Sequence, residues 1–339
     1  MKNSEVFLSI IVPVYNVENF IERCLDSVFC QLSNDCEIIL VDDGSTDKSG
    51  KICDKYKELY PILCKVYHKD NQGAYPTRNF ALDRAIGKWI WLIDPDDYIE
   101  PTAIADFRSI INSHPKVDII TSGFKRFGCN WTGDLENVFG EDQIIDGEKY
   151  LLAGYFNSYL WANVYRHSFL KENNLRFNDD LNSQGDWLFN IQAYIVANYI
   201  YMSGNHSYNY NKSNPTSTLS RHDEPHLLRN VDNSIKAIRA MQAICEQNKH
   251  KSVYKPLMER LSFTLSGFFY GMFSANIPIV LINKVIDDFR AEELYPIWKN
   301  SNKKSNLFIM FTNCRWLFII ICMLRNGLNK KVNINRFNR

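Results

Sequence analysis

The stretch that most constrains this chain of 339 residues is an apolar run that ends abruptly in carboxylates. Residues 89–93 read Trp-Ile-Trp-Leu-Ile, and Asp94, Asp96 and Asp97 follow around a single proline. A short apolar run bounded by turn residues predicts a buried strand, whose carboxyl end is where α/β sheets bind ligands. Carboxylates this close repel one another, which favours a hard cation such as Mg²⁺ or Mn²⁺ shared with substrate phosphates. A solvated acidic turn before a helix is the alternative interpretation.

Helices alternate with short apolar strands upstream of this run. The pattern predicts strands at residues 7–13, 37–41 and 65–68, and helices at 18–31, 48–60 and 76–87. Pro13 is expected to end the first strand, because proline cannot donate to a central ladder. The alternation predicts an α/β fold with a mostly parallel, Rossmann-like sheet covered by helices. Polar turns after Val14, Val41 and Ile93 are expected to meet at one edge of it.

The pattern is less regular downstream of the run. It predicts helices at 101–113, 148–155 and 168–173, a strand at 118–124, and a loop at 128–140 with no assigned element. Another helix opens at Gly185-Asp186. A carboxylate there is explained either as a helix N-cap, which backbone N–H groups favour, or as a functional group.

The C-terminal part differs in kind. A polar, proline-containing segment at 213–225 predicts a linker, and only helices are expected beyond it. The apolar stretch 307–324 contains Arg315 and is flanked by lysines and arginines. A central arginine costs roughly 2.5–3.5 kcal/mol on insertion scales, so we expect the segment at about 305–328 to lie at an anionic membrane surface. A buried core helix and a full span are the alternatives.

Composition excludes some classes of protein. A formal net charge of +1 argues against a nucleic-acid binder, which needs a basic excess. Nine cysteines without a CxxC pair predict reduced thiols and no zinc site. The first residues lack a signal-peptide pattern, so the catalytic part is expected to be cytoplasmic, facing the inner side of the membrane.

Four segments in order carry a resemblance: Ser-Ile-Ile-Val-Pro-Val-Tyr-Asn at 9–16, Val-Asp-Asp-Gly-Ser-Thr-Asp at 41–47, Asn-Gln-Gly with Arg-Asn within 71–79, and Asp-Pro-Asp-Asp at 94–97. Together they resemble the ordered motifs of family 2 glycosyltransferases over about residues 7–220. The resemblance implies a GT-A fold, a UDP-sugar donor and inverting transfer by direct displacement. It divides the chain into a catalytic domain, 1–220, and a helical region, 221–339. Within the catalytic domain, residues 1–125 form the nucleotide-sugar half and 126–220 the acceptor half.

The resemblance also implies roles at matching positions. Pro13 and Tyr15 would flank the base, Asp43 would accept from the uracil with Asp42 beside it, Gly73, Arg78 and Asn79 would lie near the diphosphate, and Asp94 would contact the ribose. Asp96 would bind the metal, with Asp97 close to the metal or the sugar. An inverting transfer needs a base for the acceptor hydroxyl, and Asp186 is the candidate.

Two segments depart from the family pattern. Members commonly carry an acidic pair at the base, whereas here Gly185 precedes Asp186, and Pro76 and Thr77 replace the small residues usual before Arg-Asn. On the acceptor side the candidates are Trp161, Trp187 and Tyr208, for which core packing is the competing explanation.

We therefore expect an inverting glycosyltransferase that adds one sugar to a glycan or polyprenyl-diphosphate-linked acceptor in cell-surface polysaccharide synthesis, including O-antigen, capsule and exopolysaccharide. A sugar nucleotidyltransferase would need a Gly-rich phosphate loop after the first strand, where this chain has Pro13-Val14-Tyr15. A processive synthase would add several membrane helices and a Gln-x-x-Arg-Trp motif. A non-catalytic nucleotide-sugar-binding module is the remaining alternative.

Overall fold

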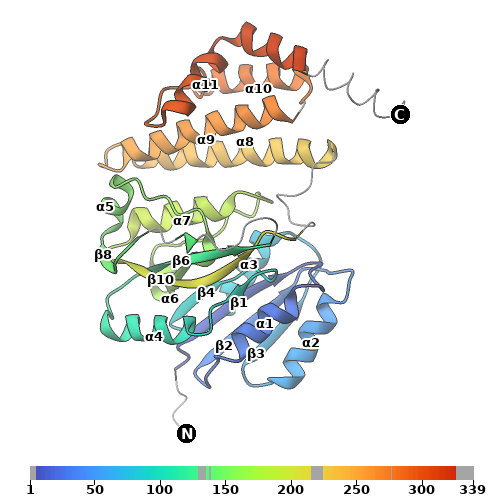
Figure 1. Ribbon diagram of the computed structural model, residues 1–339, viewed down its shortest axis with the longest axis vertical. Helices are drawn as coiled ribbons and strands as arrows, with labels where there is room; N and C mark the ends of the chain where they lie inside the picture. The colour runs from blue at the N-terminus through green and yellow to red at the C-terminus, as the bar shows by residue number, and fades with distance from the viewer. Residues whose placement is uncertain (1–4, 129–134, 137–138, 215–223, 276, 326–339) are drawn as a thin grey trace. The chain divides into compact units, whose positions relative to one another are not determined.

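The computed structural model describes residues 5–128, 135–136, 139–214, 224–275 and 277–325 (Figure 1). The chain divides into two compact units, residues 1–220 and 221–339. The first contains the sheet and the second is helical. The polar segment interpreted as a linker lies largely outside the described residues.

The first unit is built on a ten-stranded sheet in the order β3-β2-β1-β4-β9-β6-β10-β5. One half of the sheet is parallel throughout and consists of β1 (Leu8–Val14), β2 (Cys36–Asp42), β3 (Cys64–His68) and β4 (Trp89–Leu92). These four strands lie within a residue or two of the predicted ranges. Their carboxyl ends meet at one edge, which brings the polar turns after β1, β2 and β4 together, as expected.

The other half of the sheet is mixed. The strand β9 (Asn163–Arg166) runs antiparallel to β4 and to β6 (Ile119–Phe127), and β10 (Ile200–Asn211) runs parallel to β6. Three short strands pair at the margins: β5 (Tyr98–Ile99), β7 (Leu135–Glu136) and β8 (Gln143–Ile145). The sequence analysis did not predict β9 or β10. The second half of β10 is rich in Ser, Asn and His, and therefore lacks the apolar run that marks the other strands.

Helices cover the sheet (Figure 1). They are α1 (Ile21–Phe29), α2 (Ser49–Leu59), α3 (Ala74–Leu82), α4 (Ala103–Ser113), α5 (Gly147–Leu152), α6 (His167–Glu172) and α7 (Gly185–Val196). The start of α3 is two residues earlier than predicted. Gly73 opens it with φ of 94°, a conformation that favours glycine, and Pro76 falls in the first turn, where its missing N–H would be unpaired in any case.

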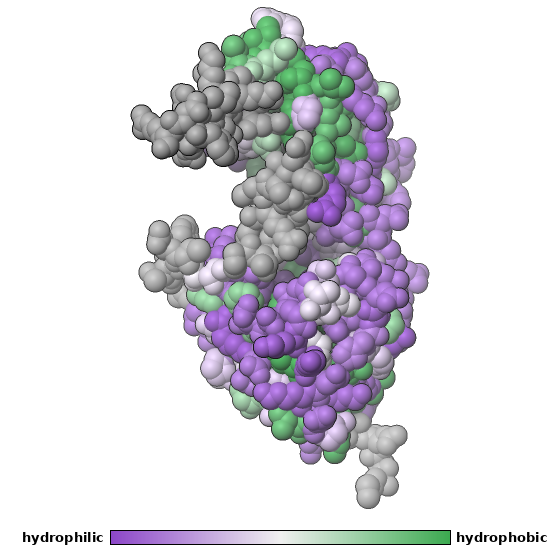
Figure 2. Space-filling view, turned by 90° about the vertical axis from the view of Figure 1, so that its right-hand side faces the viewer, coloured by the Kyte–Doolittle hydropathy of each residue, from purple (hydrophilic) through white to green (hydrophobic). Residues whose placement is uncertain are grey.

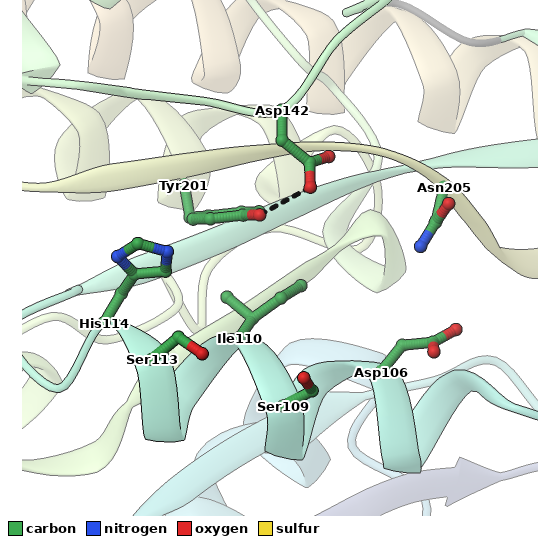
Figure 3. A pocket seen from close by; sticks show the side chains of 8 residues that line it. All are labelled: Asp106, Ser109, Ile110, Ser113, His114, Asp142, Tyr201 and Asn205. Atoms are coloured by element: carbon green, nitrogen blue, oxygen red, sulfur yellow. Dashed lines mark hydrogen bonds between the residues drawn. The ribbon is translucent and has the colours of Figure 1, made fainter.

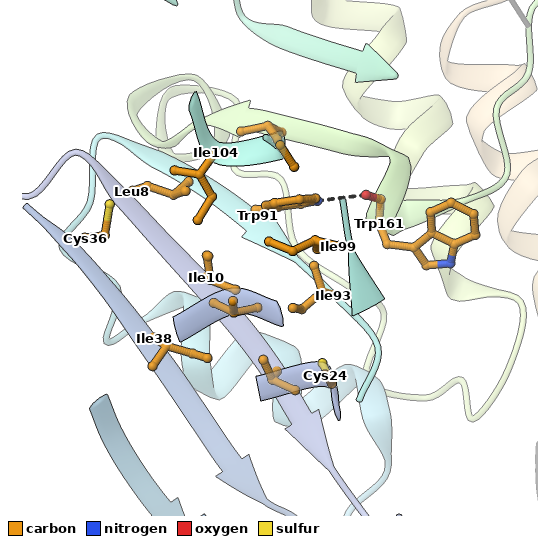
Figure 4. Close-up of a cluster of buried hydrophobic side chains, with 14 of the residues drawn as sticks. Leu8, Ile10, Cys24, Cys36, Ile38, Trp91, Ile93, Ile99, Ile104 and Trp161 are labelled. Atoms are coloured by element: carbon orange, nitrogen blue, oxygen red, sulfur yellow. Dashed lines mark hydrogen bonds between the residues drawn. The ribbon is translucent and has the colours of Figure 1, made fainter. Parts of the chain in front are cut away.

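The β1 strand is buried on both faces. Leu8, Ile10 and Val12 join a core cluster with side chains of α1 and α4 (Figure 4). Ile11, which alternates with them along the strand, is also buried, on the opposite face. This explains the continuous apolar run in the sequence. Within the cluster the indole N–H of Trp91 donates to the carbonyl of Trp161 at 2.8 Å, which ties β4 to the segment before β9.

Pro13 does not end β1, which continues to Val14 in register with β2. The carbonyl of Ile11 accepts from the amide of Ile93, so the backbone of Pro13, two residues on, points to the same side. The β1–β4 ladder stops at Leu92. The missing donor therefore lies beyond that ladder, at the place where β1 and the turn after β4 separate.

The second unit contains α8 (Glu224–Gln247), α9 (Tyr254–Ser274), α10 (Ile279–Ala291) and α11 (Lys303–Asn313), followed by a helical segment at 315–325. Among the described residues no single helix has the length and apolar character to cross a membrane. Only α11 and 315–325 taken together reach that threshold, with a bend of 96° between them.

Candidate active site

The turn after β4 places three carboxylates at the carboxyl edge of the sheet, beside the turns that follow β1 and β2. They differ in exposure. Asp94 and Asp96 are partly exposed, whereas Asp97 is fully buried, with 0% of its surface accessible. The backbone amide of Asp94 donates to the hydroxyl of Tyr208 at 3.0 Å, so β10 supports the turn from beneath.

Asp97 is enclosed by β10. One of its carboxylate oxygens accepts the backbone amide of Asn211 at 2.7 Å, and the other has no hydrogen-bond partner among the described residues. Burial, together with the charges of Asp96 and Asp94, raises the pKa of Asp97 well above its usual range. Its position accounts for a role in joining the turn to β10. Contact with a metal or sugar, expected from the sequence, would require this carboxylate to be uncovered.

Asp96 is partly exposed. Its carboxylate accepts from the side-chain amide of Asn214 at 2.8 Å, and its carbonyl accepts from the side chain of Asn211 at 3.1 Å. Burial and the neighbouring charge of Asp94 raise the pKa of Asp96. Within the described residues no side-chain ion pair neutralises it.

Arg78 joins two of the predicted residues. Its guanidinium donates to Asp94 at 2.7 Å and to Asp186 at 2.9 Å, and its side chain is 6% exposed. The structure thus links the turn after β4 to the start of α7 through one buried cation. The sequence analysis placed Arg78 near the diphosphate, and in this structure its two paired groups are carboxylates.

Asp186 lies in the first turn of α7 but does not cap it. The N-cap position is Gln184, whose side chain makes no capping hydrogen bond, and the Asp186 carboxylate binds Arg78 instead. The N-cap interpretation of Asp186 is therefore wrong. Burial raises the pKa of Asp186, while the charge of Arg78 opposes the rise. A partly exposed carboxylate with a raised pKa suits proton acceptance.

Asp42 and Asp43, at the end of β2, are both buried and bonded within the chain. Asp43 accepts from the Lys69 ammonium and from the backbone amides of Gln72 and Gly73, at 3.0 and 2.8 Å for the amides. Asp42 accepts from the amide of Ser45 at 3.0 Å and contacts His68. Asp43 thus fixes the Asn71-Gln72-Gly73 turn.

The other residues expected to bind the sugar donor differ in exposure. Tyr15 is 48% exposed beyond β1, and Pro13 is partly exposed. Asn79 is buried, and its side chain exchanges hydrogen bonds of 2.9 and 3.0 Å with the backbone of Phe177. That pairing gives Asn79 a structural role in holding the segment that leads to α7.

The acceptor-side aromatic residues separate into two groups. Trp161 and Tyr208 are 4% and 0% exposed and stack on each other at 4.2 Å between ring centroids. Packing explains both, so neither presents a face for a sugar in this structure. Trp187 is partly exposed, one residue after Asp186.

Sequence reasoning missed four residues that shape the site: Lys69, Asn211, Asn214 and Tyr75. The hydroxyl of Tyr75 accepts the backbone amide of Gly185, the residue before Asp186. Lys69 lies two residues before the Asn71 motif, and a buried acid near that motif could have pointed to a cation there. Asn211 and Asn214 are more than 110 positions from the carboxylates they bind, so no local pattern indicates them.

A polar hollow elsewhere in this unit lies between α4 and β10 (Figure 3). It is lined by Asp106, His114, Asp142 and Tyr201 among others, and Tyr201 donates to Asp142 at 2.6 Å. Since Tyr201 is near the amino end of β10, this hollow is toward the edge opposite the carboxylates. It contains none of the predicted site residues.

The side chains present could supply only some of the ligands of a divalent cation. No group of three His, Cys, Asp or Glu side chains in the described part of the chain could hold a metal by itself. Mg²⁺-type sites in phosphate-transferring enzymes, however, commonly use one or two carboxylates and complete the shell with substrate phosphates. Burial and the charge of Asp94 raise the pKa of Asp96, and a cation bound beside it would offset this repulsion.

Comparison with known proteins agrees with this geometry. Residues 9–171 match the family described as Glycosyl transferase family 2. Residues 9–171 are thus a family 2 glycosyltransferase domain. It is 32% identical over 216 residues to the uncharacterized glycosyltransferase EpsJ of Bacillus subtilis, with 62% of each chain covered. It is 32% identical over 205 residues to Staphylococcus aureus TarS, a poly(ribitol-phosphate) beta-N-acetylglucosaminyltransferase, covering 60% of this chain and 35% of TarS. The chain spans less than two thirds of the length of each of these two relatives.

Solved structures confirm the predicted fold class. A crystal structure of TarS residues 1–349 in complex with UDP-GlcNAc superposes with a TM-score of 0.59 at 21% identity, covering 95% of this chain and 92% of that one. The mannosyltransferase PcManGT from Pyrobaculum calidifontis, in complex with GDP-Man and Mn²⁺, gives 0.50 at 17% identity, covering 97% and 89%. The family 2 domain thus has the GT-A architecture: a mostly parallel sheet, with helices following it in the chain.

Proposed function

We propose that this protein is an inverting glycosyltransferase that moves one sugar from a UDP-sugar to a glycan or polyprenyl-diphosphate-linked acceptor in cell-surface polysaccharide synthesis. The observation that carries the proposal is the Arg78 bridge. It brings Asp186, from the acceptor half, into one charged network with Asp94, from the donor half.

In this mechanism Asp186 takes the proton of the acceptor hydroxyl as that oxygen attacks the anomeric carbon. The bond between the anomeric carbon and UDP breaks on the opposite face of the sugar. One displacement therefore inverts the configuration at that carbon. Arg78 orients the Asp186 carboxylate and limits the rise of its pKa. Asp94 is left to contact the donor ribose through its partly exposed carboxylate.

The donor base would lie beside Tyr15 and Pro13, where β1 separates from the turn after β4. Asp43 is the acceptor proposed for the uracil ring, with Asp42 behind it. Gly73 immediately precedes α3, so a diphosphate beside it would lie near the N–H groups at the start of that helix. Support for uridine comes from the TarS complexes with UDP-GlcNAc and UDP.

Asp96 is the proposed ligand of Mn²⁺ or Mg²⁺, with Asp97 behind it. A cation bound there would neutralise charge that develops on the leaving diphosphate. The Mn²⁺ complex of PcManGT supports this choice. PcManGT binds GDP-Man, so the fold alone does not select the base.

A panel of UDP- and GDP-sugars, with Mn²⁺ and a mixture of lipid-linked glycan acceptors, tests the proposal. We expect UDP release that depends on the acceptor and on one of the UDP-sugars. Pyrophosphate formed from a sugar phosphate and UTP would establish a nucleotidyltransferase instead. Donor binding without turnover for every acceptor would indicate a binding module.

We also propose that the protein is cytoplasmic and peripheral to the inner face of the plasma membrane, attached through the second unit. Figure 2 shows hydrophobic surface gathered over this unit. Within 303–325, six large apolar side chains are exposed: Leu307, Met310, Trp316, Ile320, Met323 and Leu324. Arg315 pairs with Asp287, which neutralises the central charge of this segment, and exposed Lys303 and Lys304 suit anionic headgroups.

Vesicle sedimentation tests the attachment. The variant Leu307→Ser/Met310→Ser/Trp316→Ser should lose most binding to vesicles containing phosphatidylglycerol, because it removes the apolar contact and leaves the charges. The matched control is Ile62→Ser, which removes one of the most exposed apolar side chains of the first unit. Deletion of residues 305–339 should likewise move the protein to the soluble fraction. Unchanged sedimentation of both variants would refute the attachment.

A further inference from the structure

Two side chains of α3, one helical turn apart, contact two successive residues at the start of α7. Arg78 binds the Asp186 carboxylate, and the hydroxyl of Tyr75 accepts the backbone amide of Gly185 at 2.7 Å. Positions i and i+3 lie on the same helix face, so one face of α3 holds both the backbone and the side chain at this point.

The Tyr75 hydroxyl supplies what α7 lacks. The first amides of a helix have no partner within it and usually bond to the side chain of the N-cap residue. Here Gln184 occupies that position in a left-handed conformation, with φ of 66°, and its side chain does not cap the helix. The first helical amide, that of Gly185, is capped instead by a residue 110 positions away.

The Tyr75 ring also requires a glycine opposite. A Cβ atom at residue 185 would lie 2.7 Å from two atoms of the ring, closer than real contacts allow. The ring has little freedom to move aside. It is 3% exposed and stacks on Phe177, which in turn stacks on Phe189 of α7 at 4.3 Å. Tyr75 and Gly185 therefore fit only as a pair.

We propose that Tyr75 is a positioning residue for Asp186, and that it works by capping α7 from α3 through a contact that only glycine at 185 permits. The inference rests on the proposed role of Asp186 as the base. With the amide held by Tyr75 and the carboxylate held by Arg78, the first turn of α7 has one orientation. Burial raises the pKa of the Tyr75 phenol, so the hydroxyl stays neutral while it accepts the amide.

The first test removes only the hydroxyl. Tyr75→Phe keeps the stack on Phe177 and leaves the Gly185 amide without its acceptor. We expect kcat to fall about tenfold, the effect of one lost buried hydrogen bond, with the KM for the donor changed less than about twofold. Tyr201→Phe is the matched control, since its hydroxyl donates to Asp142 in the hollow away from the site. It should leave kcat unchanged. A Tyr75→Phe variant with the kcat of the wild type would overturn the proposal.

The second test examines the fit of the pair by thermal unfolding, which does not depend on turnover. Gly185→Ala and Tyr75→Ala should each lower the melting temperature. The double variant should lose less than the sum, because the added methyl then has room. Additive losses would overturn the pairing. If Asp186→Asn keeps full activity while the losses remain non-additive, the base assignment fails and the Tyr75–Gly185 contact stands.

Discussion

Two groups of carboxylates meet at the edge of this sheet, and they differ in what neutralises them. One group has partners within the chain that carry or can carry a positive charge: Asp43 with Lys69, both Asp94 and Asp186 with Arg78, and Asp42 with His68 when that ring is protonated. The carboxylates of the other group, Asp96 and Asp97, accept from the amides of Asn214 and Asn211 and form no ion pair among the described residues. The polypeptide thus completes the charge balance of the first group and leaves that of the second open.

The difference favours Asp96 over the first group as the ligand of the divalent cation that we propose. Burial and mutual repulsion raise the pKa of Asp96 and Asp97. The charge of Arg23 opposes the rise at Asp96, but its guanidinium donates to the Asp96 carbonyl and not to the carboxylate. For Asp186 the charge of Arg78 opposes the same burial effect. An arginine fixed in the chain, such as Arg78, can orient a catalytic base. A divalent metal ion that binds together with the donor diphosphate can instead neutralise the charge of the leaving group. Substitutions in each group of carboxylates test this difference separately.

The largest effect is expected from Asp186→Asn. The amide keeps the shape of the side chain and its contact with Arg78 but cannot take a proton. Transfer should therefore fall about 10²–10⁴-fold. Affinity for UDP, measured by calorimetry, should change little. As a control, Asp83→Asn removes a carboxylate from an exposed pair with Arg176 and should keep full activity. Transfer at the wild-type rate in Asp186→Asn would exclude it as the base.

A smaller but still large effect should separate Asp96 from Asp97. Asp96→Asn should lower transfer about 100-fold and remove the response to added Mn²⁺, because a cation shared with the diphosphate loses its charged ligand. Asp97→Asn should keep most activity, since an amide oxygen can still accept from Asn211. Titration of activity with Mn²⁺ after EDTA treatment checks both. The reverse ranking would assign the metal to Asp97.

The two halves of the sheet also differ in how far the sequence predicts them. β1, β2 and β4 are continuous apolar runs because helices cover both faces, and each ends in a polar turn. Their carboxyl ends must meet at one edge in a parallel sheet. The sequence alone is therefore enough to place Asp43 and Asp94 together.

β10 could not be predicted in this way. It contains Ser207, Asn209 and Asn211, which are buried but bond to other parts of the chain, so no apolar pattern marks it. The sequence also does not show that Tyr208 and Trp161 stack on each other in the core. Both were therefore candidates for sugar binding, although packing accounts for them. The Tyr75–Gly185 contact spans 110 positions, and sequence alone shows only two departures from the family pattern.

A third prediction removes a cation from the neutralised group. In Lys69→Met the Asp43 carboxylate stays buried and keeps only its two backbone donors. Breaking a buried pair by removing one partner typically costs about 3 kcal/mol, so urea unfolding should show a clear loss of stability. Lys55→Met breaks an exposed pair with Glu22 and should change stability little. Equal stability in the two variants would show that Lys69 does not neutralise Asp43.

The smallest effect concerns the contact between His68 and Asp42, which should weaken as the histidine loses its proton. His68 contacts Asp42 at 2.9 Å and Asp54 at 3.0 Å, and hydrogen bonds to these carboxylates raise the pKa of His68. A histidine whose pKa is raised on folding stabilises the protein fully below its unfolded pKa, near 6.5, and loses that contribution as pH rises through the folded pKa.

Relative to His68→Gln, the wild type should therefore be more stable below about pH 6.5 and lose that advantage progressively as the pH rises above it. The ring is half exposed, so the difference in melting temperature should be only about 1–3 °C. Asp54→Asn should narrow the difference without abolishing it, because Asp42 remains. A difference that is constant with pH would mean that His68 acts at Asp42 as a neutral hydrogen-bond donor, and that Asp42 belongs with Asp96 and Asp97 among the carboxylates the chain leaves without a cation.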